Sequence, residues 1–310
     1  MTHNVHLDTD LGGDTDDLCA LALLLARPDV QLTGITTCID EAGRRAGYVS
    51  YALQLAGRAA IPVAAGAQGG LLGLRVQPDY PDDRLMWPEP VAPRPGDPGE
   101  ALDLLDASID RGATIIAIGP YTNLALFEAM RPGKLARTKV VLMGGWFGLP
   151  RPGLPQWGAN MDWNVHEDEA ASRRLLECCR PILVPFPLGL ETYLRAADLP
   201  RLERAGPLAA VIARQGRAHG ETYSMNALGR AHALLPDDLL NFHFDPLACA
   251  VALGWDGVRT EDARIMLELD DGWPFERLDP SGHPASVVTE VDGARFNRLW
   301  LDTVAPEPVP

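Results

Sequence analysis

Apolar and polar stretches alternate along the chain with the spacing of strands and helices. Residues 5–7 are a short apolar run, residues 18–26 a longer one made of helix formers, and residues 30–38 read as a second strand. The pattern continues as helices at 41–57, 100–111, 124–130 and 168–178, and as strands at 61–65, 114–118, 140–143 and 182–184. Strands that alternate with helices predict an α/β fold with a doubly wound, mostly parallel central sheet.

The later part of the chain is mostly helical in pattern. We expect helices at 196–217, 219–235, 245–253 and 292–303, and late strands at 263–269 and 286–291. The helix at 245 begins with Asp245 and Pro246, an acidic cap followed by proline at the first position. No repeat or boundary divides the sequence, so residues 1–310 are predicted to form one domain with helical C-terminal additions.

Polar or glycine-rich turns follow several of the predicted strands, notably at 8–17, 119–123 and 144–146. The carboxyl ends of parallel strands share one edge of the sheet, where open α/β folds bind their ligands. Residues 66–98 interrupt the alternation with a stretch rich in glycine and proline. We interpret it as a long surface excursion, since loops of that length are either functional or disordered.

Composition limits the classes of partner. The formal net charge is -15, which argues against nucleic acid or an anionic membrane, because both require clustered lysine and arginine. The five cysteines show no CxxC spacing and predict neither a disulfide framework nor a zinc site. No signal-peptide pattern is visible at the N-terminus, and no apolar run approaches the roughly 18 residues of a membrane span. The expected location is a reducing cytoplasm.

The turn after the first strand concentrates acid around two glycines. Two like charges about 4 Å apart repel by roughly 1 kcal/mol in water and about 4 kcal/mol at an effective dielectric of 20. Helix capping explains one or two such residues. A full set of oxygen ligands instead predicts a hard divalent ion or a polyhydroxylated ligand. The carboxylates are Asp8, Asp10, Asp14, Asp16 and Asp17.

Four motifs in order give the chain a family resemblance. The acidic turn is followed by Gly-Pro-x-Thr-Asn at 119–123, Met-Gly-Gly at 143–145 and Asp-Pro at 245–246. This series resembles the nucleoside hydrolases, calcium-dependent N-ribohydrolases of the inosine–uridine type. The family's opening signature is Asp-x-Asp-Pro-Gly-x-Asp-Asp, present here over residues 8–17 with two extra residues. The resemblance covers about residues 5–254 and implies hydrolysis of a ribonucleoside to ribose and free base, by a homodimer or homotetramer.

The resemblance also implies a calcium site and a catalytic base. Asp10 would be both a calcium ligand and the general base for the attacking water. Asp17 would bind calcium through both oxygens, and the backbone carbonyl of Thr122 and the side chain of Asp245 would complete the protein ligands. A carboxylate cluster suits this reaction, because breaking an N-glycosidic bond develops positive charge on the sugar.

The same resemblance assigns residues to the sugar. Asp16 and Asn164 would hydrogen-bond the ribose 2′- and 3′-hydroxyls. Asn160 and Asp162 would lie near the 5′-hydroxyl, and Asp8 would support the turn from behind.

The leaving-base half of the pattern departs from the family. A histidine often precedes the metal-binding aspartate and helps to protonate the leaving base, but here that position is Phe244. His243 comes one residue earlier, and a helix start could still bring it near the base. A His-Gly pair after the third strand is not evident, and Met86-Trp87 falls in that region instead. An asparagine common after the second strand is replaced by Asp40-Glu41, so base activation needs another group or an unusual leaving group.

Several aromatic and titratable side chains allow two interpretations. Stacking on a nucleobase and ordinary packing are both open for Trp87, Trp146, Trp157 and Trp163. A general acid or a solvated helix face are the alternatives for His219, Tyr223 and His232, the second being the commoner for any one residue. Arg44 and Arg45 look like a solvated charged face.

Two other functions fit parts of the pattern. A phosphohydrolase would use Asp8 as nucleophile and Asp10 as acid, but it needs a later lysine, and Lys134 and Lys139 lie in no suitable context. A calcium-dependent ribose-binding paralogue without catalysis, or with an altered leaving group, is motivated by Phe244.

Overall fold

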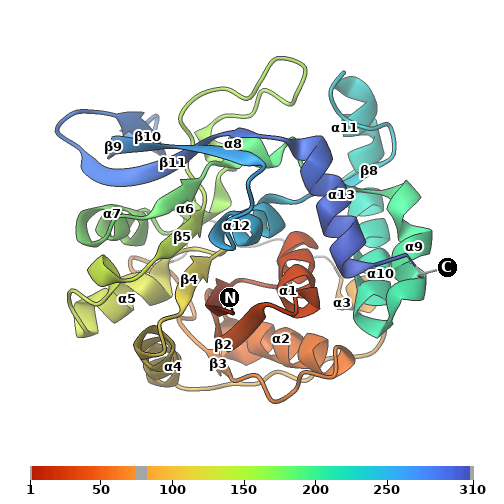
Figure 1. The fold of residues 1–310 in the computed structure, drawn as a ribbon, viewed down its shortest axis with the longest axis horizontal. Coiled ribbons are helices and arrows are strands. Elements are labelled where there is room, and N and C mark those ends of the chain that lie inside the picture. Colours follow the sequence, from red (N-terminus) through yellow and green to blue (C-terminus); the bar gives the residue numbers. More distant parts are fainter. Residues whose placement is uncertain (1, 74–81, 308–310) are drawn as a thin grey trace.

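The computed structural model describes residues 2–73 and 82–307. Within them a nine-stranded sheet runs in the order β10-β9-β11-β6-β5-β4-β1-β2-β3 (Figure 1). The strands from β11 to β3 pair in parallel, and β9 and β10 are antiparallel additions at one edge. The predicted α/β class with a mostly parallel sheet is therefore confirmed. The strands are β1 (His3–Thr9), β2 (Val30–Thr37), β3 (Val63–Ala65), β4 (Thr114–Ala117), β5 (Val140–Met143), β6 (Ile182–Val184), β9 (Val258–Asp270), β10 (Trp273–Leu278) and β11 (His283–Val291).

Helices cover both faces of the sheet. Figure 1 shows α4, α5 and α7 on one face and α1, α2 and α12 on the other, with α13 outside α1. Each face has its own buried apolar cluster. These helices are α1 (Asp16–Ala26), α2 (Arg44–Leu55), α4 (Pro98–Asp110), α5 (Thr122–Met130), α7 (Glu169–Cys178), α12 (Phe244–Ala252) and α13 (Gly293–Val304).

A smaller group of elements lies beside α1. The antiparallel pair β7 (Tyr193–Arg195) and β8 (Leu239–Phe242) packs with helices on the chain between 199 and 231. These are α9 (Leu199–Ala205), α10 (Pro207–Thr222) and α11 (Met225–Ala231). Shorter helices are α3 (Asp83–Met86), α6 (Trp163–Glu167) and α8 (Phe186–Gly189).

The strand order reverses between β1 and β4. The chain runs from β1 outward to β2 and β3, then returns to the other side of β1 for β4, β5 and β6. The ends of β1 and β4 therefore border a crevice that no connection covers, which is where doubly wound sheets bind ligands.

The structure differs from the sequence prediction in a few elements. The predicted late strands lie within β9 and β11, but β10 was not predicted. Its segment contains Pro274 and two charged residues, which an edge strand tolerates because one side of its backbone needs no partner. The predicted helix at 196–217 is broken at Gly206, which has a φ of 135°. The predicted excursion at 66–98 contains α3, and its residues 74–81 lie outside the described residues.

Over the two described ranges, none of the helices combines the length and the apolar content needed to cross a bilayer.

Candidate active site

Asp8 anchors the end of β1 rather than facing the crevice. It is fully buried, and its Oδ2 accepts hydrogen bonds from the Thr36 hydroxyl at 2.5 Å and from the Asn123 amide at 2.8 Å. Burial raises the pKa of Asp8 to about 7. These bonds join β1 to β2 and α5, the supporting position expected for Asp8.

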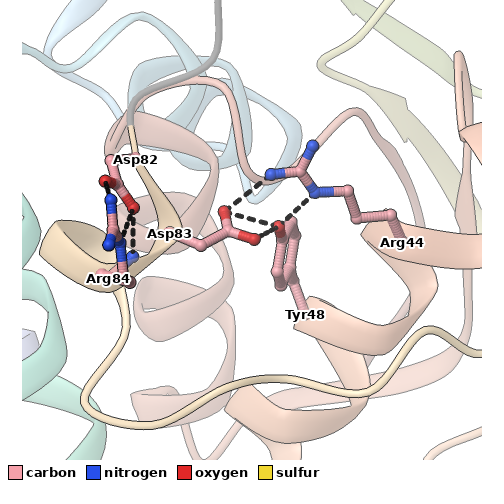
Figure 2. A network of polar contacts seen from close by, with 5 residues as sticks. All are labelled: Arg44, Tyr48, Asp82, Asp83 and Arg84. Atoms are coloured by element: carbon pink, nitrogen blue, oxygen red, sulfur yellow. Dashed lines mark hydrogen bonds and ion pairs between the residues drawn. The ribbon is translucent and has the colours of Figure 1, made fainter.

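The acidic turn is held in shape by α2 and α3. Gly12 has a φ of 121°, and a Cβ there would lie 2.6 Å from the ring of Tyr48. That ring stacks on Trp87 with centroids 4.9 Å apart. Figure 2 shows the Asp83 carboxylate accepting hydrogen bonds from the Tyr48 hydroxyl and from Arg44, at 2.6 to 2.8 Å. Trp87 is 2% exposed and lies in this packing, which favours ordinary packing over stacking on a nucleobase.

The crevice at the strand ends contains a cavity of about 600 Å³. One part of its lining is polar and strongly acidic, and another part is aromatic and apolar. The polar residues are Asp10, Asp14, Asp16, Asp17, Arg45, Asn164, His219, Asn241 and Asp245. The apolar residues include Ile118, Met143, Trp157, Met161, Trp163, Phe186, Phe242 and Phe244.

The carboxylates of the cavity raise one another's pKa. One oxygen from each of Asp14, Asp16 and Asp17 lies within 4.8 Å of the others. Burial, together with the neighbouring carboxylates, raises the pKa of Asp16, Asp17 and Asp245 well above the usual range. A group of buried oxygens that resists ionisation in this way is a donor set suited to a hard divalent cation, which would restore the charged forms.

Asp10 sits at the junction of the two halves of the sheet. Gly119, just after β4, approaches so closely that a Cβ there would lie 2.7 Å from Asp10 Oδ1. Burial raises the pKa of Asp10, and the guanidinium of Arg45, 3.8 Å from Asp10 Oδ2, opposes that effect. The Asp10 carboxylate is thus fixed in the cavity beside a cation of the protein itself.

Asn164 is placed in the cavity as predicted, on the short helix α6. Its amide donates to the carbonyls of Ile118 at 2.9 Å and Met143 at 3.1 Å, which fixes the side chain against the ends of β4 and β5. Asn160 and Asp162 are not among the cavity residues. Asn160 is exposed, and Asp162 is buried as the cap of α6, where it also accepts a hydrogen bond from Gly145 N at 2.5 Å. Their place near the 5′-hydroxyl therefore stays a prediction from the resemblance.

The two residues before Asp245 point in opposite directions. Phe244 faces the cavity and stacks on Phe186 at 5.1 Å. His243 is fully buried on the other side, with its ring 4.3 Å from that of Trp300, and burial lowers its pKa to about 3. A neutral imidazole packed in the core does not reach the substrate, so the predicted role of His243 is corrected.

Thr122 begins α5, and its hydroxyl donates to Asp168 at 2.6 Å. Thr122 does not appear in the cavity lining. Its carbonyl therefore stays a predicted ligand on the strength of the sequence motif.

Two cavity residues were expected to be solvated. Arg45 is 3% exposed; its backbone N–H donates to Asp40 Oδ1 at 2.7 Å and its Nε donates to the Ile39 carbonyl at 2.8 Å. His219 is 6% exposed and lies in the cavity wall. Of the four tryptophans considered, Trp157 and Trp163 line the cavity.

Comparison with known proteins identifies the class. The family model described as inosine-uridine preferring nucleoside hydrolase matches residues 5–298, and the chain belongs to this family. The chain is thus an N-glycosyl hydrolase of ribonucleosides in class, as the sequence resemblance predicted. It is 30% identical over 229 residues to the pyrimidine-specific ribonucleoside hydrolase RihA of Enterobacter sp. (strain 638), covering 69% of each chain. It is 28% identical over 228 residues to an uncharacterized protein of Schizosaccharomyces pombe, covering 69% of this chain and 72% of that one.

Solved structures share the fold. A plant nucleoside hydrolase, the PpNRh1 enzyme, superimposes with a TM-score of 0.76 at 20% identity and covers 99% of this chain and 100% of its own. A purine-preferring ribonucleoside hydrolase from Gardnerella vaginalis superimposes with a TM-score of 0.75 at 21% identity, covering 97% and 98%.

Proposed function

We propose that the chain hydrolyses the N-glycosidic bond of a ribonucleoside with calcium bound among Asp10, Asp17, Asp245 and the carbonyl of Thr122. One observation supports this most directly: carboxylates from the first turn and from α12 line one cavity at the β1–β4 switch point. Their raised pKa values and all-oxygen chemistry fit a hard cation. When bound, calcium would supply charge that orients the ribose diol and acidifies a water.

The side chains of the cavity have separate roles in the reaction. Asp10 takes the proton of the attacking water, and the charge of Arg45 favours its ionised form. Asp16 and the fixed amide of Asn164 hydrogen-bond ribose hydroxyls. The positive charge that develops on the sugar lies among carboxylates, which stabilise it electrostatically.

The structure argues against the phosphohydrolase alternative, because Asp8 cannot act as its nucleophile. Asp8 is fully buried and already accepts bonds from Thr36 and Asn123, so it cannot attack a phosphoryl group in the cavity. The ribose-binding alternative keeps one observation in its favour, because Phe244 occupies the cavity where a proton donor was expected.

A nucleoside panel tests the proposal. Inosine, uridine, adenosine and cytidine are incubated with the protein in millimolar calcium or in EDTA, and released ribose is measured. We expect turnover that needs calcium and falls by at least about 10²-fold in Asp10→Asn, while the exposed Asp237→Asn keeps wild-type rates. Nucleoside binding by calorimetry without ribose release would support the non-catalytic alternative instead.

Light scattering on the same sample tests the predicted homodimer or homotetramer.

A further inference from the structure

The wall of the cavity beside Asp245 offers the leaving base no proton. Phe186 and Phe244 stack there with centroids 5.1 Å apart, and Phe242 packs against Phe244 at 5.5 Å. His243 is turned into the core behind them. A leaving base on this side meets aromatic carbon, which can stack on it but cannot neutralise the charge it acquires.

His219 lies in the cavity wall from another element, α10. Among the cavity residues in the described parts of the chain, it carries the one imidazole. Its Nδ1 lies 2.9 Å from the Leu240 carbonyl, so Nδ1 carries a hydrogen and donates it, and the second ring nitrogen is the one left for a ligand. The adjacent ring of Tyr223, 4.7 Å away, also lines the cavity.

Two glycines bring His219 into this position. A Cβ at Gly216 would lie 2.6 Å from a methyl of Leu194, and a Cβ at Gly220 would lie 2.6 Å from a methyl of Leu240. Because neither residue has a side chain, α10 approaches β7 and β8 closely enough for His219 to reach the Leu240 carbonyl.

Asp14, on the acidic side of the cavity, interacts electrostatically with His219. Asp14 belongs to the turn that is two residues longer than the family signature, and its oxygen accepts from Asp16 N at 2.8 Å. Burial opposes ionisation of Asp14, but hydrogen bonding with Asp16 and the charge of His219 lower its pKa overall.

We propose that His219 is the proton donor for the leaving base, in place of the residue that is Phe244 in this chain. The proposal rests on the nucleoside hydrolase activity proposed above. As the C1′–N bond breaks, its electron pair passes to the base, and the Nε2 proton of His219 passes to a nitrogen or oxygen of that base. Water supplies hydroxide to C1′ and its proton goes to Asp10. His219 is left neutral with hydrogen on Nδ1, the tautomer that the Leu240 carbonyl stabilises.

The test compares substrates whose leaving groups differ in their need for a proton. Inosine and uridine leave poorly without protonation, whereas p-nitrophenyl β-ribofuranoside releases a stable anion. His219→Asn keeps an N–H that can bond to the Leu240 carbonyl but has no proton to give. His232→Gln is the matched control, because His232 Nδ1 also lies 2.9 Å from a carbonyl, that of Leu228, and the residue is outside the cavity lining.

We expect His219→Asn to lower kcat on the nucleosides by about 10²- to 10⁴-fold and to leave p-nitrophenyl riboside hydrolysis within a few-fold of wild type. Equal losses on both substrates, or no loss on either, would overturn the role. Should His219→Asn fail to fold, His219→Gln gives the same comparison. A wild type that cleaves nucleosides at a rate that His219→Asn leaves unchanged overturns the donor alone, whereas a wild type that cleaves no nucleoside overturns the proposed function.

Discussion

Asp17→Asn tests whether the carboxylates at the start of α1 are tolerated because a cation joins them. The nearest oxygens of Asp14, Asp16 and Asp17 lie within 4.8 Å of one another. At that distance two full charges repel by about 3.5 kcal/mol at an effective dielectric of 20, and by about 0.9 kcal/mol in water. The asparagine keeps an oxygen that can accept the hydrogen bond of the Thr9 hydroxyl. In EDTA at pH 8 we therefore expect this variant to be more stable than wild type, by about 1–3 kcal/mol.

Calcium should reverse the order. Calcium at 100 times its Kd stabilises the wild type by about 2.7 kcal/mol. For a chain of 310 residues that corresponds to a rise in Tm of about 4 °C. Asp17→Asn should lose most of this rise, and the exposed Asp237→Asn should keep it. The assay is thermal unfolding of all three proteins in EDTA and in millimolar calcium. A variant destabilised equally in both buffers would refute the reasoning, because that is how the loss of an ordinary buried hydrogen bond behaves.

Three further changes test single contacts. Burial and the nearby Asp162 raise the pKa of Glu276 to about 8, so its stabilising contribution is complete below about pH 4 and lost as the pH rises through 8. Glu276→Gln should flatten the fall of Tm between about pH 4.5 and 8, and an unchanged slope would contradict the pKa. Gly119→Ala places a Cβ 2.7 Å from Asp10 Oδ1 and should lower kcat on the order of 10²-fold; full activity would show that the base is not held there. Arg45→Met removes the charge that lowers the pKa of Asp10, so the acid limb of the kcat/KM profile should move to higher pH, and an unmoved limb would exclude Asp10 as the base.

The sequence predicted those parts of the site that depend on strand ends. Asp10, Asp16 and Asp17 follow the first strand directly, and Asn164 follows β5, whereas Asp245 follows the antiparallel β8 and was expected in the site from the resemblance alone. Because parallel strands end at a common edge, residues far apart in the chain could be expected to meet, and all five line the cavity. Chain order indicated the shared crevice, because the connections of a doubly wound sheet leave few alternatives, and the resemblance supplied the role of each residue.

Residues whose orientation depends on tertiary packing were predicted poorly. Two interpretations stayed open for Trp87 because its loop gives no sign that Tyr48 stacks on it. His243 and Phe244 are neighbours, and only the start of α12 decides which one faces the cavity. His219 was expected on a solvated face, but a signal was present: Gly216 and Gly220 lie four residues apart on one side of a helix, which permits close approach to another element.

The acidic residues of the cavity come from two helices far apart in the sequence, α1 and α12. Asp16 and Asp17 begin α1, Asp245 lies in the first turn of α12, and the Trp300 indole of α13 donates to the Cys19 carbonyl of α1 at 3.1 Å. While the chain is being synthesised, the acidic turn and the apolar helix behind it leave the ribosome long before α12 and α13 exist. A nascent chain that stops short of α12 carries unbalanced acid next to an uncovered apolar helix. We therefore expect stable folding to need α12 and α13, and shorter products to be bound by chaperones and cut by proteases.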